Sequence, residues 1–140
     1  MSFLLDTNVI SELRKSAQRA EPAVGSWAEA QHLDALYLSV ITVTELEIGV
    51  GRVERRDARQ GEVLRQWLND RVIEAFDHRI LPVDLPVALR SAAFHVPDPR
   101  PERDALIAAT ALLHDLVVVT RNEADFDQLG VRTINPWRHG

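Results

Sequence analysis

Four acidic side chains occupy comparable places along this 140-residue sequence, because each follows a predicted strand or opens a predicted helix. They are Asp6, Glu45, Asp104 and Asp125. The carboxyl ends of parallel strands meet at one edge of a sheet, so we expect the four side chains to lie together there. Carboxylates at such close range repel one another and cannot all stay ionised unless a cation lies among them. Oxygen-only ligands favour Mg²⁺ or Mn²⁺, and the pattern therefore predicts a divalent-metal site.

Each acid taken alone also has a simple structural explanation. Asp6 precedes a predicted helix and could be its N-cap, a position that Asp, Thr and Asn favour. Thr42 and Glu45 have the spacing of a capping box at the start of a third helix. Asp104 lies in the first turn of a helix, where a negative charge interacts favourably with the helix dipole. Four independent capping or dipole roles at one edge of the sheet explain the pattern less well than one shared site does. A purely structural α/β domain, in which every acid is a cap, stays an alternative.

Residues 103–126 predict the helix and strand that bring two of these acids together. Residues 105–113 are apolar on every side of a helical wheel, which is typical of a helix buried between layers. Residues 116–119 then predict a short, fully buried strand of a parallel sheet. A helix packed antiparallel to the strand that follows it places its first turn beside the end of that strand. This arrangement would bring Asp104 close to Asp125.

The remaining elements alternate in the same way. Strands are predicted at residues 3–5, 36–40, 80–83 and 131–134, and helices at 9–13, 23–33, 57–76, from Thr42 onward and after Asp84. This alternation predicts a single α/β domain over residues 1–140, with a short parallel sheet of about five strands flanked by helices on both faces. Pro82 indicates an edge strand. Gly49 and Gly51 interrupt a helix interior, which suggests close packing against a neighbouring element.

The composition excludes several classes of protein. With 46% hydrophobic and 26% charged residues, the sequence suits one globular domain with a substantial core. The absence of cysteine excludes disulfides and thiolate-bound zinc. The first residues form no basic, apolar signal region, and no apolar run approaches the ~20 residues needed to span a bilayer. We therefore expect a soluble, cytoplasmic protein with no membrane partner.

The formal net charge of −5 argues weakly against a nucleic-acid ligand, since nucleic-acid binders usually carry a basic surface. A local acidic site would account for several of the negative charges. Lys15 is the only lysine among the 16 basic residues, and the arginines that make up the rest match the geometry of phosphate. Their densest group consists of Arg52, Arg55, Arg56 and Arg59, where the third predicted helix ends and the next one begins. A solvated helix face is the slightly better explanation of that group.

Five motifs occur in order along almost the whole chain, from residue 3 to residue 137. They read LDTNVISEL at 5–13, TEL at 44–46 before Gly49, DALIAATA at 104–111, TRN at 120–122 with DF at 125–126, and NPW at 135–137. In this order and at these intervals they resemble the PIN-domain ribonucleases, and more narrowly the VapC/FitB-type toxins of toxin–antitoxin pairs. The resemblance implies a PIN fold in which the four acids hold one or two Mg²⁺ or Mn²⁺ ions.

The resemblance also implies a role for each position of the motifs. Asp6 and Asp104 would be the principal metal ligands, and Glu45 a ligand or a base acting through water. Asp125 would bind a second ion, with Asp127 as its strongest rival. Polar support would come from Thr7, Asn8, Thr120 and Asn122. The sequence departs from the family pattern at Asp115, where a glycine is common, and at Pro86 near a helix start.

The function implied by the resemblance is that of a metal-dependent endoribonuclease. It would be the toxin of a pair, neutralised by a cognate antitoxin, and it would form a homodimer. The protein would recognise RNA mainly through its phosphates, and Arg52, Arg55 and Arg56 are the candidate residues for these contacts.

Two alternatives to a toxin stay open, and a third is disfavoured. The chain could be a catalytically silent module that binds RNA or protein, or an RNA-processing nuclease without an antitoxin. A phosphotransferase of the haloacid dehalogenase or response-regulator type is disfavoured, because both need a lysine in the site. We expect Lys15, two turns along the first helix, to point away from it. The haloacid dehalogenase type also needs a second Asp where this chain has Asn8.

Overall fold

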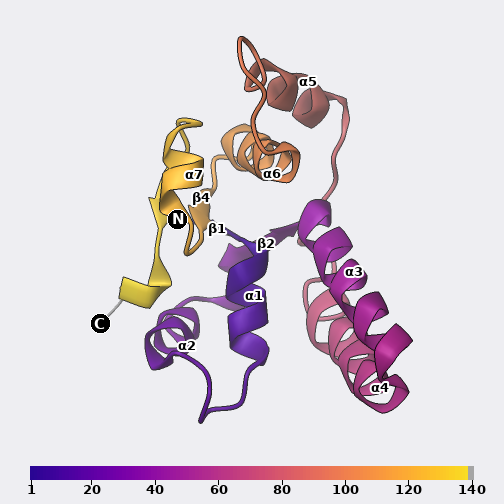
Figure 1. Ribbon diagram of the computed structural model, residues 1–140. Coiled ribbons are helices and arrows are strands. Elements are labelled where there is room, and N and C mark those ends of the chain that lie inside the picture. The colour runs from indigo at the N-terminus through magenta and orange to yellow at the C-terminus, as the bar shows by residue number, and fades with distance from the viewer. Residues whose placement is uncertain (139–140) are drawn as a thin grey trace.

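Five short strands form a parallel sheet in the computed structural model, which describes residues 1–138 (Figure 1). The strands are β1 (Phe3–Leu5), β2 (Leu36–Ser39), β3 (Ile80–Leu81), β4 (Val117–Val119) and β5 (Thr133–Ile134). Their order across the sheet is β3-β2-β1-β4-β5, and every neighbouring pair is parallel. The α/β architecture expected from the sequence is therefore confirmed, as is the edge position of β3.

Helices cover both faces of this sheet, as predicted, because alternate strand residues point to opposite sides. Phe3 and Leu5 of β1 belong to one hydrophobic core, and Leu4 between them belongs to the other. The first core is closed by α1 (Thr7–Arg14), α2 (Pro22–Glu29), α3 (Val40–Arg56), α4 (Ala58–Trp67) and its π-helical continuation η2 (Leu68–Ile73). The second is closed by α6 (Glu102–Leu113) and α7 (Glu123–Asp127), and α5 (Leu85–Ala93) packs on α6. Short 3₁₀ turns, η1 (Leu33–Ala35) and η3 (Pro136–Arg138), complete the described elements.

Helix α3 begins two residues earlier than the sequence suggested, and the capping-box interpretation of Thr42 and Glu45 is wrong. Strand β2 ends at Ser39, whose hydroxyl oxygen accepts a hydrogen bond from the backbone N–H of Ile41 at 3.0 Å. Because Ser39 already provides the N-cap, the helix starts at Val40 without an intervening turn. Thr42 is buried inside the first turns, and Glu45 is free of any capping role.

The close approach between elements occurs at Gly61 and not, as expected, at Gly49 or Gly51. A Cβ atom built on Gly49 or Gly51 would meet nothing within 4 Å. A Cβ on Gly61 would lie 2.5 Å from the Cα of Glu54, because α3 and α4 pack as a tight hairpin. In Figure 1 this hairpin extends away from the sheet, with the carboxyl end of α3 at its far tip.

The central helix α6 is the most deeply buried helix of the second layer, although one side of its last turn is open. Its small side chains, such as Ala105 and Ala108, are wholly inaccessible, whereas Leu113 is exposed. Its first turn lies at the same edge as the end of β1. Within residues 1–138, no helix combines the length and the apolar character needed to cross a bilayer.

Candidate active site

Asp6 is anchored by both of its carboxylate oxygens where β1 ends. Its Oδ1 accepts the backbone N–H of Thr7 at 2.8 Å, so Asp6 does cap α1, as the simple explanation required. Its Oδ2 accepts the hydroxyl of Thr120 at 2.8 Å and the amide Nδ2 of Asn8 at 3.3 Å. The backbone N–H of Asp6 also donates to the carbonyl of Val119. Asp6 thus uses Oδ1 to cap α1, and its Oδ2 belongs to a polar cluster with Asn8 and Thr120.

The loop after β4 is joined to the loop after β1 through that cluster. Thr120 is wholly buried, and its hydroxyl oxygen accepts the backbone N–H of Asn122 at 3.0 Å. Asn8 Nδ2 lies 3.3 Å from the same hydroxyl oxygen, and Asn8 Oδ1 accepts the backbone N–H of Arg121 at 3.3 Å. The structure therefore places Thr7, Asn8, Thr120 and Asn122 around Asp6.

Glu45 reaches the same edge from the second turn of α3. The hydroxyl of Thr7 donates to Glu45 Oε1 at 2.7 Å, and it lies 3.3 Å from the hydroxyl of Thr42. The second oxygen, Oε2, lies 3.5 Å from the Nη1 atom of Arg103. A single threonine next to Asp6 therefore sets the orientation of the second acid.

The pKa values of Asp6 and Asp104 show that the four acids share one electrostatic environment. Burial, and to a smaller extent the charges of Asp6, Asp125 and Glu45, together raise the pKa of Asp104 to about 6. Burial also raises the pKa of Asp6, with Glu45 and Asp125 adding to the rise and hydrogen bonds from Thr120 and Thr7 opposing it. The charged forms of Asp6 and Asp104 are thus destabilised by the neighbouring carboxylates, which is the condition that a cation would relieve.

The effects on the pKa values of Asp6 and Asp104 distinguish Asp125 from Asp127. Asp125 adds to the raised pKa of both Asp6 and Asp104, whereas Asp127 contributes to neither. Asp127 Oδ1 instead accepts the hydroxyl of Thr133 at 3.3 Å, on the other side of α7. The geometry favours Asp125 as the fourth acid.

A depression of about 460 Å³ opens over Asp6, Glu45 and Asp104. Asp125 does not line it, although its charge acts on Asp6 and Asp104. Its lining consists of Asp6, Thr7, Asn8, Ser11, Glu12, Lys15, Glu45, Asp104, Arg121, Asn122 and Trp137. The motifs at both ends of the chain, LDTN and NPW, therefore contribute to one surface. The lining residues that were not assigned to the site from the sequence are Ser11, Glu12, Lys15, Arg121 and Trp137, although all of them except Lys15 lie within the quoted motifs.

Lys15 also lines this depression, so the expectation that it points away is wrong. Helix α1 ends at Arg14, and Lys15 has an extended backbone (φ −63°, ψ 152°) that turns its side chain back along the helix. Its ammonium Nζ lies 2.9 Å from Glu12 Oε1. Glu12 is buried, and its other oxygen accepts the backbone N–H of Glu21 at 2.8 Å. Lys15 is therefore held at the outer edge by an ion pair and does not reach Asp6.

The arginines of α3 are not brought to the site. Arg52, Arg55 and Arg56 are exposed and lie on the last turns of α3, toward the tip of the hairpin in Figure 1. None of them lines the acidic depression.

The donor chemistry fits a hydrated divalent ion. Within residues 1–138, no group of three or more His, Cys, Asp or Glu side chains is close enough to surround a metal ion alone. Mg²⁺ is usually bound by one or two carboxylates and keeps several of its waters. A pair of carboxylates, with the others acting through water, therefore suffices for such an ion and would offset their mutual repulsion.

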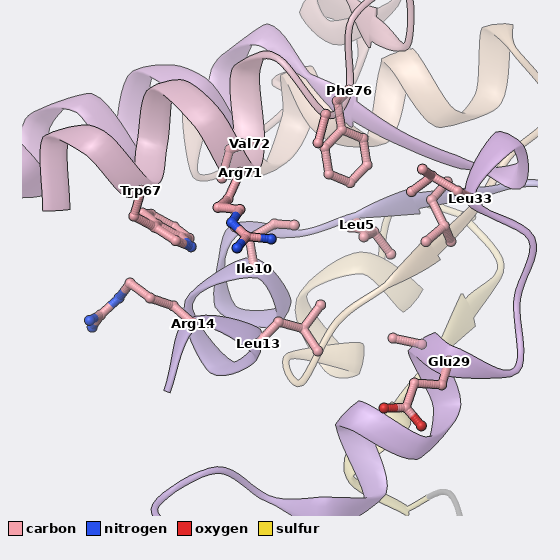
Figure 2. A pocket seen from close by; sticks show the side chains of 13 residues that line it. Leu5, Ile10, Leu13, Arg14, Glu29, Leu33, Trp67, Arg71, Val72 and Phe76 are labelled. Atoms are coloured by element: carbon pink, nitrogen blue, oxygen red, sulfur yellow. The ribbon is translucent and has the colours of Figure 1, made fainter. Parts of the chain in front are cut away.

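A second, apolar depression of about 500 Å³ lies between α1, the end of α2 and the α4–η2 segment. Figure 2 shows Leu13, Trp67 and Phe76 among the side chains around it. At one end, the guanidinium of Arg14 lies 5.8 Å from the ring centroid of Trp67. Arg14 and Trp67 also line a narrower groove that includes Glu45. The apolar depression thus continues toward the acidic one.

Comparison with known proteins gives one consistent family. The sequence matches the PIN domain family over residues 3–131. It is 40% identical over 143 residues to the VapC ribonuclease Y4jK of Sinorhizobium fredii, covering 96% of this chain and 97% of that protein. It is 39% identical over 142 residues to toxin FitB of Neisseria gonorrhoeae, covering 96% of this chain and 98% of that toxin. Its fold is similar to a chain in the crystal structure of FitAcB from Neisseria gonorrhoeae, with a TM-score of 0.88, 36% identity, and coverage of 97% of this chain and 99% of that chain.

Proposed function

Because the chain belongs to the PIN-domain family, we propose that it is a metal-dependent endoribonuclease and the toxin of a toxin–antitoxin pair. The observation that carries this proposal is the cluster formed by Asp6, Glu45, Asp104 and Asp125 at the carboxyl edge of the sheet. Intact acids disfavour a catalytically silent module, because carboxylates that repel one another are costly unless they bind a cation.

We propose that Asp6 and Asp104 are the principal ligands of Mg²⁺ or Mn²⁺, with Glu45 and Asp125 nearby. A bound ion of this kind would make a water molecule easier to deprotonate and would neutralise charge that develops on the phosphate. The raised pKa of Asp104, about 6, means that without a cation this carboxyl ionises at a higher pH than an ordinary aspartate does.

The surrounding residues orient the acids for this chemistry. Thr120 and Asn8 hold Asp6 Oδ2, so the side chain needs little reorganisation before it acts. The Thr7 hydroxyl occupies Glu45 Oε1, which leaves Oε2 as the atom of Glu45 that can take a proton from an attacking water. Arg103 Nη1 lies 3.5 Å from that oxygen, so its charge is paired with Glu45.

The partner that we propose is an antitoxin with an apolar segment and a basic side chain. The apolar depression beside Trp67 suits the segment, and its continuation toward Glu45 leads to the four-acid cluster. A guanidinium would match clustered carboxylates through paired hydrogen bonds. Co-expression with a partner encoded beside this chain should relieve growth inhibition. Full rescue after deletion of the partner's pocket-binding segment would contradict this mode of neutralisation.

We also propose that the chain forms a homodimer, and α5 offers a surface for it. Leu85 and Leu89 lie one turn apart on α5 and are 70% and 65% exposed, and Val96 in the following loop is 75% exposed. Apolar side chains grouped this way on a surface are typical of an interaction site.

The direct test of the proposed activity is cleavage of a labelled single-stranded RNA in the presence of Mg²⁺ or Mn²⁺. Excess EDTA should abolish cleavage, and added Mn²⁺ should restore it. Equal cleavage in EDTA would contradict a metal-dependent reaction.

A further inference from the structure

The basic side chains around the acidic depression differ in how their charge is used. Lys15 is paired with Glu12 at 2.9 Å, and Arg103 with Glu45 at 3.5 Å. Arg121 also lines the depression, but within residues 1–138 it forms no ion pair with a carboxylate. Its charge acts on Glu12 only at a distance, as the smallest of the causes that lower the pKa of that residue, so its N–H groups stay available to a ligand that approaches the acids.

The guanidinium of Arg121 is stacked on an aromatic ring. Its central carbon lies 5.2 Å from the ring centroid of Trp137. A guanidinium over an aromatic face keeps its N–H groups in its own plane, pointing outward past the ring. Those N–H groups match the spacing of two phosphate oxygens.

Both members of this stack have a fixed backbone. The N–H of Arg121 donates to Asn8 Oδ1 at 3.3 Å, and the preceding residue, Thr120, is hydrogen-bonded to Asp6. The N–H of Trp137 donates to Asn135 Oδ1 at 2.9 Å, and its half-buried ring packs against the first hydrophobic core. A side chain held in place before binding loses less conformational freedom when the ligand arrives.

We propose that Arg121 binds an RNA phosphate next to the scissile bond and that Trp137 positions its guanidinium. This inference rests on the proposed ribonuclease function and identifies how the acidic site receives a polyanion. An RNA strand that enters this depression faces the carboxylates of Asp6, Glu45 and Asp104. The positive charge of Arg121 at the rim would offset their repulsion of the phosphates, which the distant arginines of α3 cannot do. Arg121 thus takes the part that the sequence suggested for Arg52, Arg55 and Arg56.

The test is the salt dependence of RNA binding. The Asp6→Asn variant is used in Mg²⁺ so that the RNA stays uncut, and binding of a fluorescein-labelled single-stranded oligonucleotide is followed by anisotropy at several salt concentrations. In this Asp6→Asn background, the further substitution Arg121→Gln should raise Kd about 5- to 10-fold. It should also reduce the slope of log Kd against log salt concentration by about 0.7, the value expected for one phosphate contact on a single strand. Arg121→Lys keeps the charge and should restore the slope, but with a higher Kd than arginine gives.

Arg55→Gln is the matched control, since it removes the same charge from an exposed site on α3 and should leave the slope unchanged. Trp137→Leu keeps an apolar side chain and should raise Kd while the slope stays that of the parent. A purely structural role of the stack would lower the melting temperature of Arg121→Gln without moving Kd or the slope, and this result would overturn the proposal. Equal slope changes for Arg55→Gln and Arg121→Gln would overturn it too, as would absence of RNA binding.

This experiment separates the inference from the proposed activity. If the wild-type chain cleaves RNA but Arg121→Gln binds as its parent does, the inference is wrong and the activity stands. If the chain never cleaves RNA but binds it with a slope that depends on Arg121, the inference stands and the activity is wrong.

Discussion

Replacing Asp104 by Asn should stabilise the metal-free protein at neutral pH. Burial and the charges of Asp6, Asp125 and Glu45 raise the pKa of Asp104 from an ordinary value of 3.8 to about 6. The folded protein therefore holds this proton more tightly than the unfolded chain does. Stability consequently falls as pH rises from about 4 through 6, and the cost of ionised Asp104 is fully present above pH 7.

The size of the effect follows from the pKa shift. A shift of about two units corresponds to roughly 3 kcal/mol in the free energy of unfolding, which partial exposure of the side chain reduces to about 1.5 kcal/mol. Asn also loses an interaction with the helix dipole of roughly 0.5 kcal/mol. The expected net gain is about 1 kcal/mol, or roughly 4 °C in Tm for a chain of this size.

The assay is a thermal melt of wild type and Asp104→Asn in EDTA at pH 7.5 and at pH 4.5. The electrostatic relief should shrink to about a third at pH 4.5, because the folded carboxyl is then already protonated. Glu102→Gln is the matched control: Glu102 is exposed in the first turn of the same helix, so its loss should lower Tm slightly at pH 7.5.

Millimolar Mn²⁺ should raise the Tm of wild type more than that of Asp104→Asn, because only the intact site gains the full binding free energy. The reasoning is refuted if Asp104→Asn melts below wild type in EDTA at pH 7.5 and both proteins respond equally to Mn²⁺. Asp104 would then be only a first-turn acid.

Three further predictions concern other parts of the molecule. Thr7→Val removes the hydrogen bond that orients Glu45 and should lower kcat for RNA cleavage about 10-fold with little change in KM; an unchanged kcat would contradict that role. Gly61→Ala should destabilise the protein by about 1–3 kcal/mol in chemical denaturation, because the Cβ of the new alanine has no space. Gly49→Ala should stabilise it by about 0.5–1 kcal/mol. Equal effects of the two substitutions would contradict the packing described for α3 and α4. Leu89→Glu should convert a dimer to a monomer in light scattering, and a dimer that persists would exclude α5 as its interface.

The parts of the site that the sequence predicted depend on local patterns. Short apolar runs followed by a capping residue identify where a strand ends and a helix starts. Once the strands are taken as parallel, Asp6 and Asp104 must share an edge whatever the details of packing. The same reasoning could not choose between Asp125 and Asp127, because only the tertiary packing of α7 decides which of them faces the other acids.

The features that the sequence did not predict depend on the backbone at single positions or on contacts between distant segments. The direction of Lys15 follows from an extended residue just after α1, which no helical periodicity indicates. The cap of α3 fell on Ser39 and not Thr42 because the strand runs directly into the helix. The stack of Arg121 on Trp137 joins two segments that are separate in sequence, and neither motif alone indicates the other.

The central claim is that clustered acids at the sheet edge hold a metal ion that is needed to cut RNA. Its most direct test is the rate at which wild type, Asp6→Asn and Asp127→Asn cleave a labelled single-stranded RNA, with Mn²⁺ and with excess EDTA. Asp127 is the control because it bonds to Thr133 and does not contribute to the raised pKa values of Asp6 and Asp104. Wild type and Asp127→Asn should cleave in Mn²⁺ only, and Asp6→Asn should not cleave in either buffer. Full activity of Asp6→Asn, or cleavage that survives EDTA, would contradict the claim.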